Sequence, residues 1–205
     1  MLQELAAGGV FNYFGLEEWR HYFGKKVKLD AAPAIPWAND ELRNPILKQK
    51  HFLFLGLDRL DGKPLDVLQW RRFYSDKKKH PKFYVDWYLK EPFAQKPLGL
   101  RWYWVTIQLV PDSKNLTYDQ QAALLPPEYE MPSAIERVTA NLLWYLLNDA
   151  YMDSERERTT VAEKSSEGRI VECAGFPIDG LALGSAFNQS TALRGIAASR
   201  RLPGA

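Results

Sequence analysis

Cysteine is nearly absent from this chain. Cys173 is the single cysteine among 205 residues. One thiol excludes an intramolecular disulfide and a zinc site built from several thiolates. The chain does not need such cross-links, because a domain of this length buries roughly 70% of the surface that its unfolded chain exposes. Cys173 itself occupies an apolar strand position, so we predict a small buried hydrophobic side chain there.

Long apolar runs are also missing. No stretch approaches the about 18 consecutive apolar residues that a membrane-spanning helix needs. The first residues, MLQELAAGGVFNYFG, have no basic segment followed by an apolar run, so we expect no signal peptide. These two absences leave a cytoplasmic or a virion-associated location open.

The motifs of common enzyme classes do not occur. There is no G-x-S-x-G nucleophile turn, and no G-x-G-x-x-G or phosphate-binding loop follows a predicted strand. His21, His51 and His80 are far apart and show no metal-ligand spacing. Glu155 and Glu157 alternate with arginines, which is typical of a solvated, charge-balanced segment. We therefore predict a protein that is not an enzyme and that holds no metal and no cofactor.

The chain has no large excess of positive or negative charge, because its 27 basic and 25 acidic residues give a net charge of +2. This balance does not by itself indicate nucleic acid. One basic segment, residues 77–82, lies near aromatic residues that could stack on bases while the lysines neutralise phosphates. These aromatic residues are Tyr74, Phe83, Tyr84 and Trp87. The alternative, which we favour, is a solvated turn between a helix and a strand.

The N-terminal two thirds of the chain mix helical and strand patterns. Apolar spacing and caps predict helices over 16–23 and 67–74, the second capped by Asp66. Ser133 and Glu136 form a capping box for a third helix that ends near residues 148–151. Its buried stripe is predicted to comprise Ile135, Val138, Leu142, Tyr145 and Leu146. Strands are predicted over 51–57, 83–89 and 101–110, and loops over 31–45 and 111–130.

The C-terminal segment differs in composition, being rich in glycine and poor in charge. It reads as four short strands, over 158–162, 169–174, 180–184 and 195–199, with turns at 165–168 and 177–180. Strands alternate their faces, so Val171, Cys173, Leu181 and Leu183 can hold the core while Glu172 and Ala182 point outward. The loop at 182–193 contains no Lys, Asp, Glu or Pro. The whole pattern predicts an α+β fold with short helices and a strand-rich C-terminal core.

The frame of this segment is R-x-V-x-x-x-G-F-x-x-D-G-L-x-L, then a loop, then G-I-A-A-S-R-R. It is carried by Arg169, Val171, Gly175, Phe176, Asp179, Gly180, Leu181, Leu183 and residues 195–201. The frame resembles the C-terminal variable region of proteins diversified by diversity-generating retroelements. This resemblance implies a C-type lectin-like fold. It implies a single domain over 1–205, in which 1–130 are an N-terminal elaboration and 131–205 end the core with a variable region at about 169–199.

The resemblance also implies which side chains recognise a ligand. In these proteins, adenines of asparagine codons in the template are replaced, which yields a limited set of residue types. The loop residues belong to that set except Gln189. Glu172 also lies outside the set, so the template would have to encode Gln189 and Glu172 without change. The predicted ligand-binding surface comprises Glu172, Ala182, Gly184, Ser185, Ala186, Phe187, Asn188, Ser190, Thr191 and Leu193.

The function implied is binding of an unknown ligand, a protein or other surface ligand, through this diversified surface. Nucleic acid is not the expected partner, and the oligomeric state is left open. Two alternatives remain at this point. One is a nucleic-acid-binding accessory protein that uses the basic and aromatic patch. The other is an enzyme like the formylglycine-generating enzymes, which share the same broad fold, although their chemistry relies on copper-binding cysteines and this chain has only Cys173.

Overall fold

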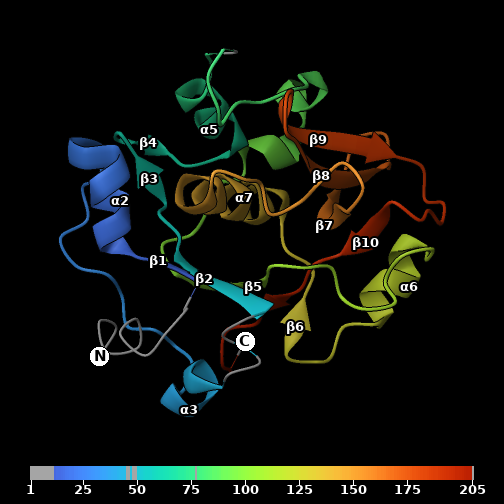
Figure 1. Ribbon diagram of the computed structural model, residues 1–205, viewed down its shortest axis with the longest axis horizontal. Helices are drawn as coiled ribbons and strands as arrows, with labels where there is room; N and C mark the ends of the chain where they lie inside the picture. Colours follow the sequence, from blue (N-terminus) through green and yellow to red (C-terminus); the bar gives the residue numbers. More distant parts are fainter. Residues whose placement is uncertain (1–11, 45–46, 48–49, 77, 205) are drawn as a thin grey trace.

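The computed structural model describes residues 12–44, 47, 50–76 and 78–204. The predictions made for residues 1–11, for Pro45 and for Lys77 lie outside this part of the chain. The described residues form the mixed α+β fold that the sequence predicts, with short helices around several sheets. Figure 1 shows the longest helix, α7, near the centre of the molecule, with sheet strands on two sides of it.

Helix α7 spans Ala134–Asn148 and begins with the predicted capping box. The hydroxyl of Ser133 accepts a hydrogen bond from the Glu136 N–H at 3.3 Å, and the Glu136 carboxylate accepts one from the Ser133 N–H at 3.4 Å. Ile135, Val138 and Leu142 are buried, as predicted. The predicted stripe is too long, because Tyr145 and Leu146 are only partly buried at the end of the helix.

A five-stranded sheet lies on one side of α7. Its strand order is β1-β2-β5-β11-β6, and neighbouring strands pair antiparallel except β1 and β2, which run parallel. The strands are β1 (Tyr13–Phe14), β2 (His51–Leu55), β5 (Trp102–Thr106), β6 (Tyr129–Glu130) and β11 (Ser199–Arg200). The predicted strands over 51–57 and 101–110 are confirmed in shorter form. Every residue of β2 is buried, which explains its continuous apolar run.

A four-stranded sheet packs on the other side of α7, in the order β10-β7-β8-β9. It consists of β7 (Arg158–Lys164), β8 (Ile170–Phe176), β9 (Gly180–Ala186) and β10 (Arg194–Ile196). Strands β7, β8 and β9 run antiparallel, and β10 joins β7 in parallel. The predicted core residues Val171, Cys173, Leu181 and Leu183 are all fully buried in the hydrophobic core, so the predicted alternation of faces holds on this side.

The fourth predicted C-terminal strand, over 195–199, is in fact two strands in two sheets. β10 ends at Ile196, and β11 begins at Ser199 in the five-stranded sheet. Between them, the Ala198 N–H donates to the Thr106 hydroxyl at 2.9 Å, and the Thr106 N–H donates to the Ala198 carbonyl at 2.8 Å. The segment therefore crosses from one sheet to the other, which an unbroken apolar run gives no reason to expect.

The predicted strand over 83–89 is wrong. Phe83 makes a single bridge to Leu181, and the chain then turns into two 3-10 helices, η2 (Trp87–Lys90) and η3 (Pro92–Gln95). The Tyr84 N–H donates to the Leu181 carbonyl at 2.9 Å, so this segment covers part of the free edge of β9. Its aromatic residues serve packing against β9 and η3 rather than a strand ladder.

Two predicted loops contain short helices, α3 (Asn39–Arg43) and α6 (Tyr118–Ala123). Helix α6 carries a capping box between Thr117 and Gln120, a signal that was present in the sequence. The predicted helices α2 (Leu16–Phe23) and α5 (Val67–Phe73) are confirmed, and the Asp66 carboxylate accepts from the Gln69 N–H at 2.6 Å. The N-terminal part of the chain also contains a small hairpin and a 3-10 helix. These are β3 (Arg59–Leu60) with β4 (Lys63–Pro64), and η1 (Gly24–Lys26).

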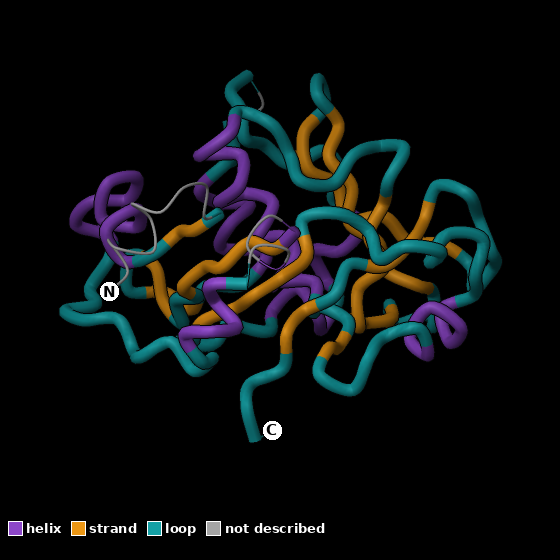
Figure 2. Tube along the Cα trace, turned by 60° about the horizontal axis from the view of Figure 1, so that its bottom comes forward, coloured by secondary structure: helices purple, strands orange, loops and turns teal. Residues whose placement is uncertain are grey.

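A single hydrophobic cluster runs from Phe14 to Leu183 and joins the two sheets through α7. Aromatic pairs such as Trp19 on Trp70, with ring centroids 5.8 Å apart, fill its N-terminal part. Figure 2 shows the strands inside and long loops around them. Over the described residues, no helix combines the length and the apolar character that a membrane span requires.

Candidate functional site

The outer face of the four-stranded sheet, opposite α7, carries two adjoining pockets. Both are lined by Arg158 and Glu172. The first, here the loop pocket, has a volume of about 290 Å³ and is lined by Arg158, Glu172, Ala186, Phe187, Gln189, Ser190, Thr191, Leu193 and Arg194. The second, here the aromatic pocket, has a volume of about 310 Å³ and is lined by Tyr84, Val85, Trp87, Arg158, Glu172, Ala174, Phe176, Ala182, Leu183, Gly184 and Ser185.

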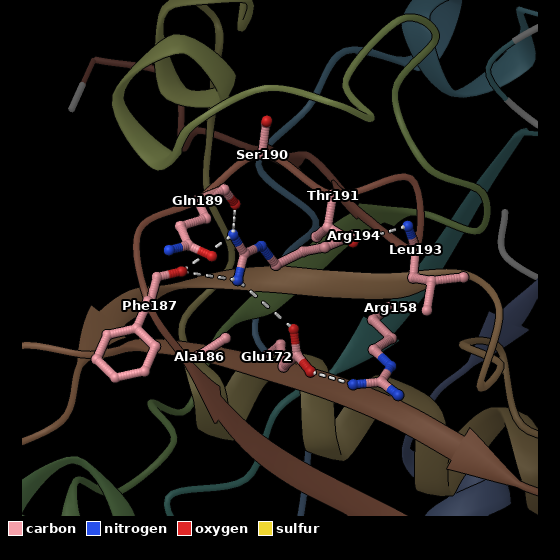
Figure 3. A pocket seen from close by; sticks show the side chains of 9 residues that line it. All are labelled: Arg158, Glu172, Ala186, Phe187, Gln189, Ser190, Thr191, Leu193 and Arg194. Carbon is pink, nitrogen blue, oxygen red and sulfur yellow. Dashed lines mark hydrogen bonds and ion pairs between the residues drawn. The ribbon is translucent and has the colours of Figure 1, made fainter.

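Arg194 fixes the loop that rims the loop pocket. Its side chain is only 2% exposed. The guanidinium donates to the carbonyl of Phe187 at 3.4 Å and to the carbonyl of Gln189, and it lies 3.8 Å from a carboxylate oxygen of Glu172 (Figure 3). Burial lowers the pKa of Arg194, while the Glu172 charge acts in the opposite direction. A strand residue thus reaches back and holds the loop by its backbone, which leaves the loop side chains free to differ.

Glu172 is shared by two arginines. One carboxylate oxygen accepts from Arg158 at 2.6 Å, and the other faces Arg194. The Glu172 side chain is 6% exposed, whereas that of Arg158 is 34% exposed. A Cβ added at Gly184 would come within 2.9 Å of the Glu172 side chain. Gly184 therefore leaves the space that this carboxylate occupies between its arginines.

The aromatic pocket is walled by the segment that covers the edge of β9. The Trp87 indole N–H donates to the Leu183 carbonyl, and Tyr84 packs on Phe176 with ring centroids 5.5 Å apart. Ala182 lies in this pocket and is 5% exposed. The expectation that Ala182 would be exposed is wrong, because the segment containing Tyr84, Val85 and Trp87 packs along its strand, and no local pattern in the sequence indicates that contact.

The structure brings most of the predicted surface residues together around these two pockets. Ser185, Phe187, Asn188, Ser190 and Leu193 are exposed. Gly184, Ala186 and Thr191 are partly exposed, and Glu172 and Ala182 are buried. Glu172 does point away from the core, as predicted, but its arginine partners cover it.

Asn188 is the predicted residue that lies apart from the pockets. Its side-chain carbonyl accepts from the Tyr118 N–H at 2.9 Å, at the start of α6. Phe187, 66% exposed, projects from the rim with the Arg169 guanidinium 5.1 Å from its ring centroid. The rim therefore offers an aromatic side chain and small polar side chains within a short stretch of chain.

The aromatic rings near the basic residues 78–82 are mostly not available for stacking. Phe83 is 4% exposed, and Tyr74 stacks on Trp70 with centroids 5.9 Å apart. Trp87 is partly buried, whereas Tyr84 is 52% exposed, and both line the aromatic pocket. Single-stranded nucleic acid is usually held by several rings on which successive bases stack, so one exposed ring gives this partner little support.

The histidines do not converge. His21 is exposed on α2, His51 is buried beside Trp104 with centroids 5.5 Å apart, and His80 stacks near Tyr145. In the part of the chain that the structure describes, no group of three or more His, Cys, Asp or Glu residues is arranged to hold a metal ion. Burial raises the pKa of the Cys173 thiol well above its usual range, which makes it a poor nucleophile.

A buried polar network that the sequence did not indicate ties α7 to β7. The Asp153 carboxylate accepts from the Arg137 guanidinium at 2.5 and 2.9 Å, from Asn141 at 2.7 Å and from the Thr159 hydroxyl at 2.6 Å. Both carboxylate oxygens are satisfied, so the network has a structural role. Only the tertiary fold brings these residues together, and a charge inside an apolar helix stripe was the one local hint.

No family model, curated protein or solved structure matches this chain.

Proposed function

We propose that this protein is a ligand-binding protein whose recognition surface is the pair of pockets on the outer face of the C-terminal sheet. The observation that carries the proposal is the gathering of the predicted surface residues around these pockets, on β8, on β9 and on the loop after β9, which Arg194 holds. The partner is a protein or another surface ligand, and the surface is diversified in the manner of retroelement variable proteins.

The change in burial along strand β9 and the loop after it supports this proposal. Leu181 and Leu183 are fully buried, while Ser185, near the end of the strand, and Phe187, just after it, are exposed. A scaffold that presents changing side chains must keep them out of its core, and loops held by rigid elements commonly carry binding residues. Small neutral side chains with an aromatic anchor also resemble the composition of binder paratopes.

The same proposal includes a C-type lectin-like fold for the C-terminal part. Support comes from the order of elements, in which a long helix is followed by three antiparallel strands, β7 to β9, and the loop connects β9 to β10, which pairs parallel with β7. The two alternatives have less support. Of the four rings near residue 80, Tyr84 alone is exposed. Cys173 is a buried thiol with no second cysteine for a copper site.

The test is a pair of displayed libraries. The first randomises Ser185, Phe187, Ser190, Thr191 and Leu193, and the control library randomises the exposed α2 positions Glu17, Arg20 and His21. Both should remain mostly protease-resistant, because surface substitutions usually change stability by less than about 0.5 kcal/mol. Selection against a panel of protein targets should yield binders from the first library far more often than from the second.

Equal yields from the two libraries, or a first library that is mostly unfolded, would contradict the proposal. A genomic observation gives an independent check: a reverse transcriptase and a near-identical repeat of the sequence encoding 169–199 are expected beside the gene.

A further inference from the structure

We infer that the recognition surface selects an acidic segment of a partner protein, with Arg158 as the fixed anchor for its carboxylate. This inference rests on the proposed function and adds the chemistry of the partner. It starts from the charge at the point where the loop pocket and the aromatic pocket meet.

The charged groups that line the two pockets are Arg158, Arg194 and Glu172, so guanidinium groups exceed carboxylates there. Arg194 is 2% exposed and is occupied by the loop carbonyls. Glu172 is 6% exposed and lies between the two arginines. A partner that enters the pockets therefore meets neither of them, and the charge left accessible is that of Arg158.

Arg158 is both exposed and pre-oriented. A third of its side chain is open to solvent, while its Nη1 donates to Glu172 at 2.6 Å and its Nε donates to the Glu155 carbonyl at 3.2 Å. These contacts hold the plane of the guanidinium, so a partner carboxylate meets donors that are already ordered. The carboxylate of the neighbouring Glu157 is paired with Lys114 at 2.8 Å.

The aromatic pocket beside Arg158 makes a protein the favoured source of the carboxylate. Tyr84, Trp87 and Phe176 surround it, and Ala182 and Gly184 leave its floor free of large side chains. Tyr, Trp and Arg around a shielded pocket are the residues that dominate protein–protein binding energy. A nucleic acid needs several cations to neutralise successive phosphates. The two pockets instead present one accessible guanidinium beside an apolar pocket, which fits a peptide that carries an acidic residue next to an apolar one.

The experiment selects short random peptides, displayed on phage, against the whole chain. The expected peptides carry Asp or Glu next to an aromatic or large aliphatic residue. A synthetic copy of a selected peptide should bind Arg158→Gln at least about tenfold more weakly than the unchanged protein, the loss expected for one charge-assisted contact. It should bind the matched control Arg156→Gln equally well, because Arg156 is exposed and lines neither pocket.

Arg158→Gln leaves Glu172 with one arginine, so thermal unfolding of each variant is recorded. The variant Arg158→Gln/Glu172→Gln removes the anchor together with its buried carboxylate and should show the same loss of binding in a folded protein. Peptides that lack acidic residues, or that bind both Arg158 variants as tightly as the unchanged protein, would overturn the inference.

A blocking variant, Ser185→Trp, separates this failure from failure of the proposed function. Binding that is lost in Ser185→Trp but kept in Arg158→Gln sinks the acidic anchor alone. Binding that survives both variants, or a selection that yields no peptide, overturns the inference and the proposed surface together. An oligo-dT probe tests the phosphates of a nucleic acid as the alternative anionic partner. If oligo-dT binds in preference to the peptide and its binding depends on Arg158, the assignment to a protein partner is overturned.

Discussion

Replacing Arg194 by methionine should both destabilise the protein and loosen the loop over residues 187–193. The substitution keeps a long side chain but removes a guanidinium that is 2% exposed and contacts the carbonyls of Phe187 and Gln189 and the carboxylate of Glu172. Loss of one partner from a buried charged group costs about 3–5 kcal/mol. Arg158 still pairs with Glu172 in the variant, so we expect the lower end, about 3 kcal/mol.

This loss corresponds to a decrease in Tm of roughly 6–12 °C for a chain of this size. Urea denaturation should report it as a lower midpoint with an unchanged slope, because the folded and unfolded surfaces remain similar. Native-state hydrogen exchange should become faster at the amides of residues 187–193, which Arg194 holds, and stay unchanged in β2. The matched control Arg156→Met removes an exposed arginine and should change stability by less than about 0.5 kcal/mol.

The reasoning would be refuted by a loss of less than about 1 kcal/mol in Arg194→Met, which is the scale of an ordinary neutral hydrogen bond. It would also be refuted by exchange at residues 187–193 that matches the unchanged protein, since the loop would then owe its order to other contacts.

Three further outcomes are expected. Leu183→Ala should cost about 2–5 kcal/mol of unfolding free energy and Ser190→Ala less than about 0.5, as urea denaturation will show, because Leu183 is fully buried and Ser190 exposed. Gly184→Ala should lower Tm while its neighbour Ser185→Ala should not, because the new Cβ displaces a carboxylate held between two arginines. Burial lowers the pKa of His51 to about 4 from 6.5. The unfolded chain therefore binds a proton first, so stability is full above pH 6.5 and falls by up to about 3 kcal/mol toward pH 4; a His51→Gln variant whose unfolding keeps the whole pH dependence would contradict this.

Helix caps and the alternation of apolar residues correctly predicted the helices and the strand that depend on neighbouring residues. The capping box of Ser133 and Glu136 begins α7, Asp66 caps α5, and the alternation of Leu181 and Leu183 gives the buried face of β9. Each of these depends on residues within a few positions of one another. The same signal occurs at Thr117 and Gln120, where it begins α6 inside the predicted loop over 111–130.

The remaining features depend on contacts between distant segments. The aromatic run at 83–89 has strand composition, but the edge of β9 and the helix η3 decide its conformation. Burial of Ala182 follows from that same packing. The pairing of Glu172 with two arginines, one before it and one after it in the chain, was equally hidden, although the alternation of faces correctly placed Glu172 on the outer side.

Strand β11 has a consequence for how the molecule assembles. It lies between β5 and β6, and Ser199 pairs with both Val105 and Glu130. The five-stranded sheet is therefore complete only when β11, which is far from both neighbours in the sequence, has paired with them. Such distant pairings slow folding, and until they form, the edges of β5 and β6 stay open to other chains. Because β11 follows the loop over residues 187–193, a loop sequence that delays the docking of β10 also delays the pairing of β11. Variants of the loop should therefore differ in the amount of folded protein that a cell accumulates, independently of how well each binds a ligand.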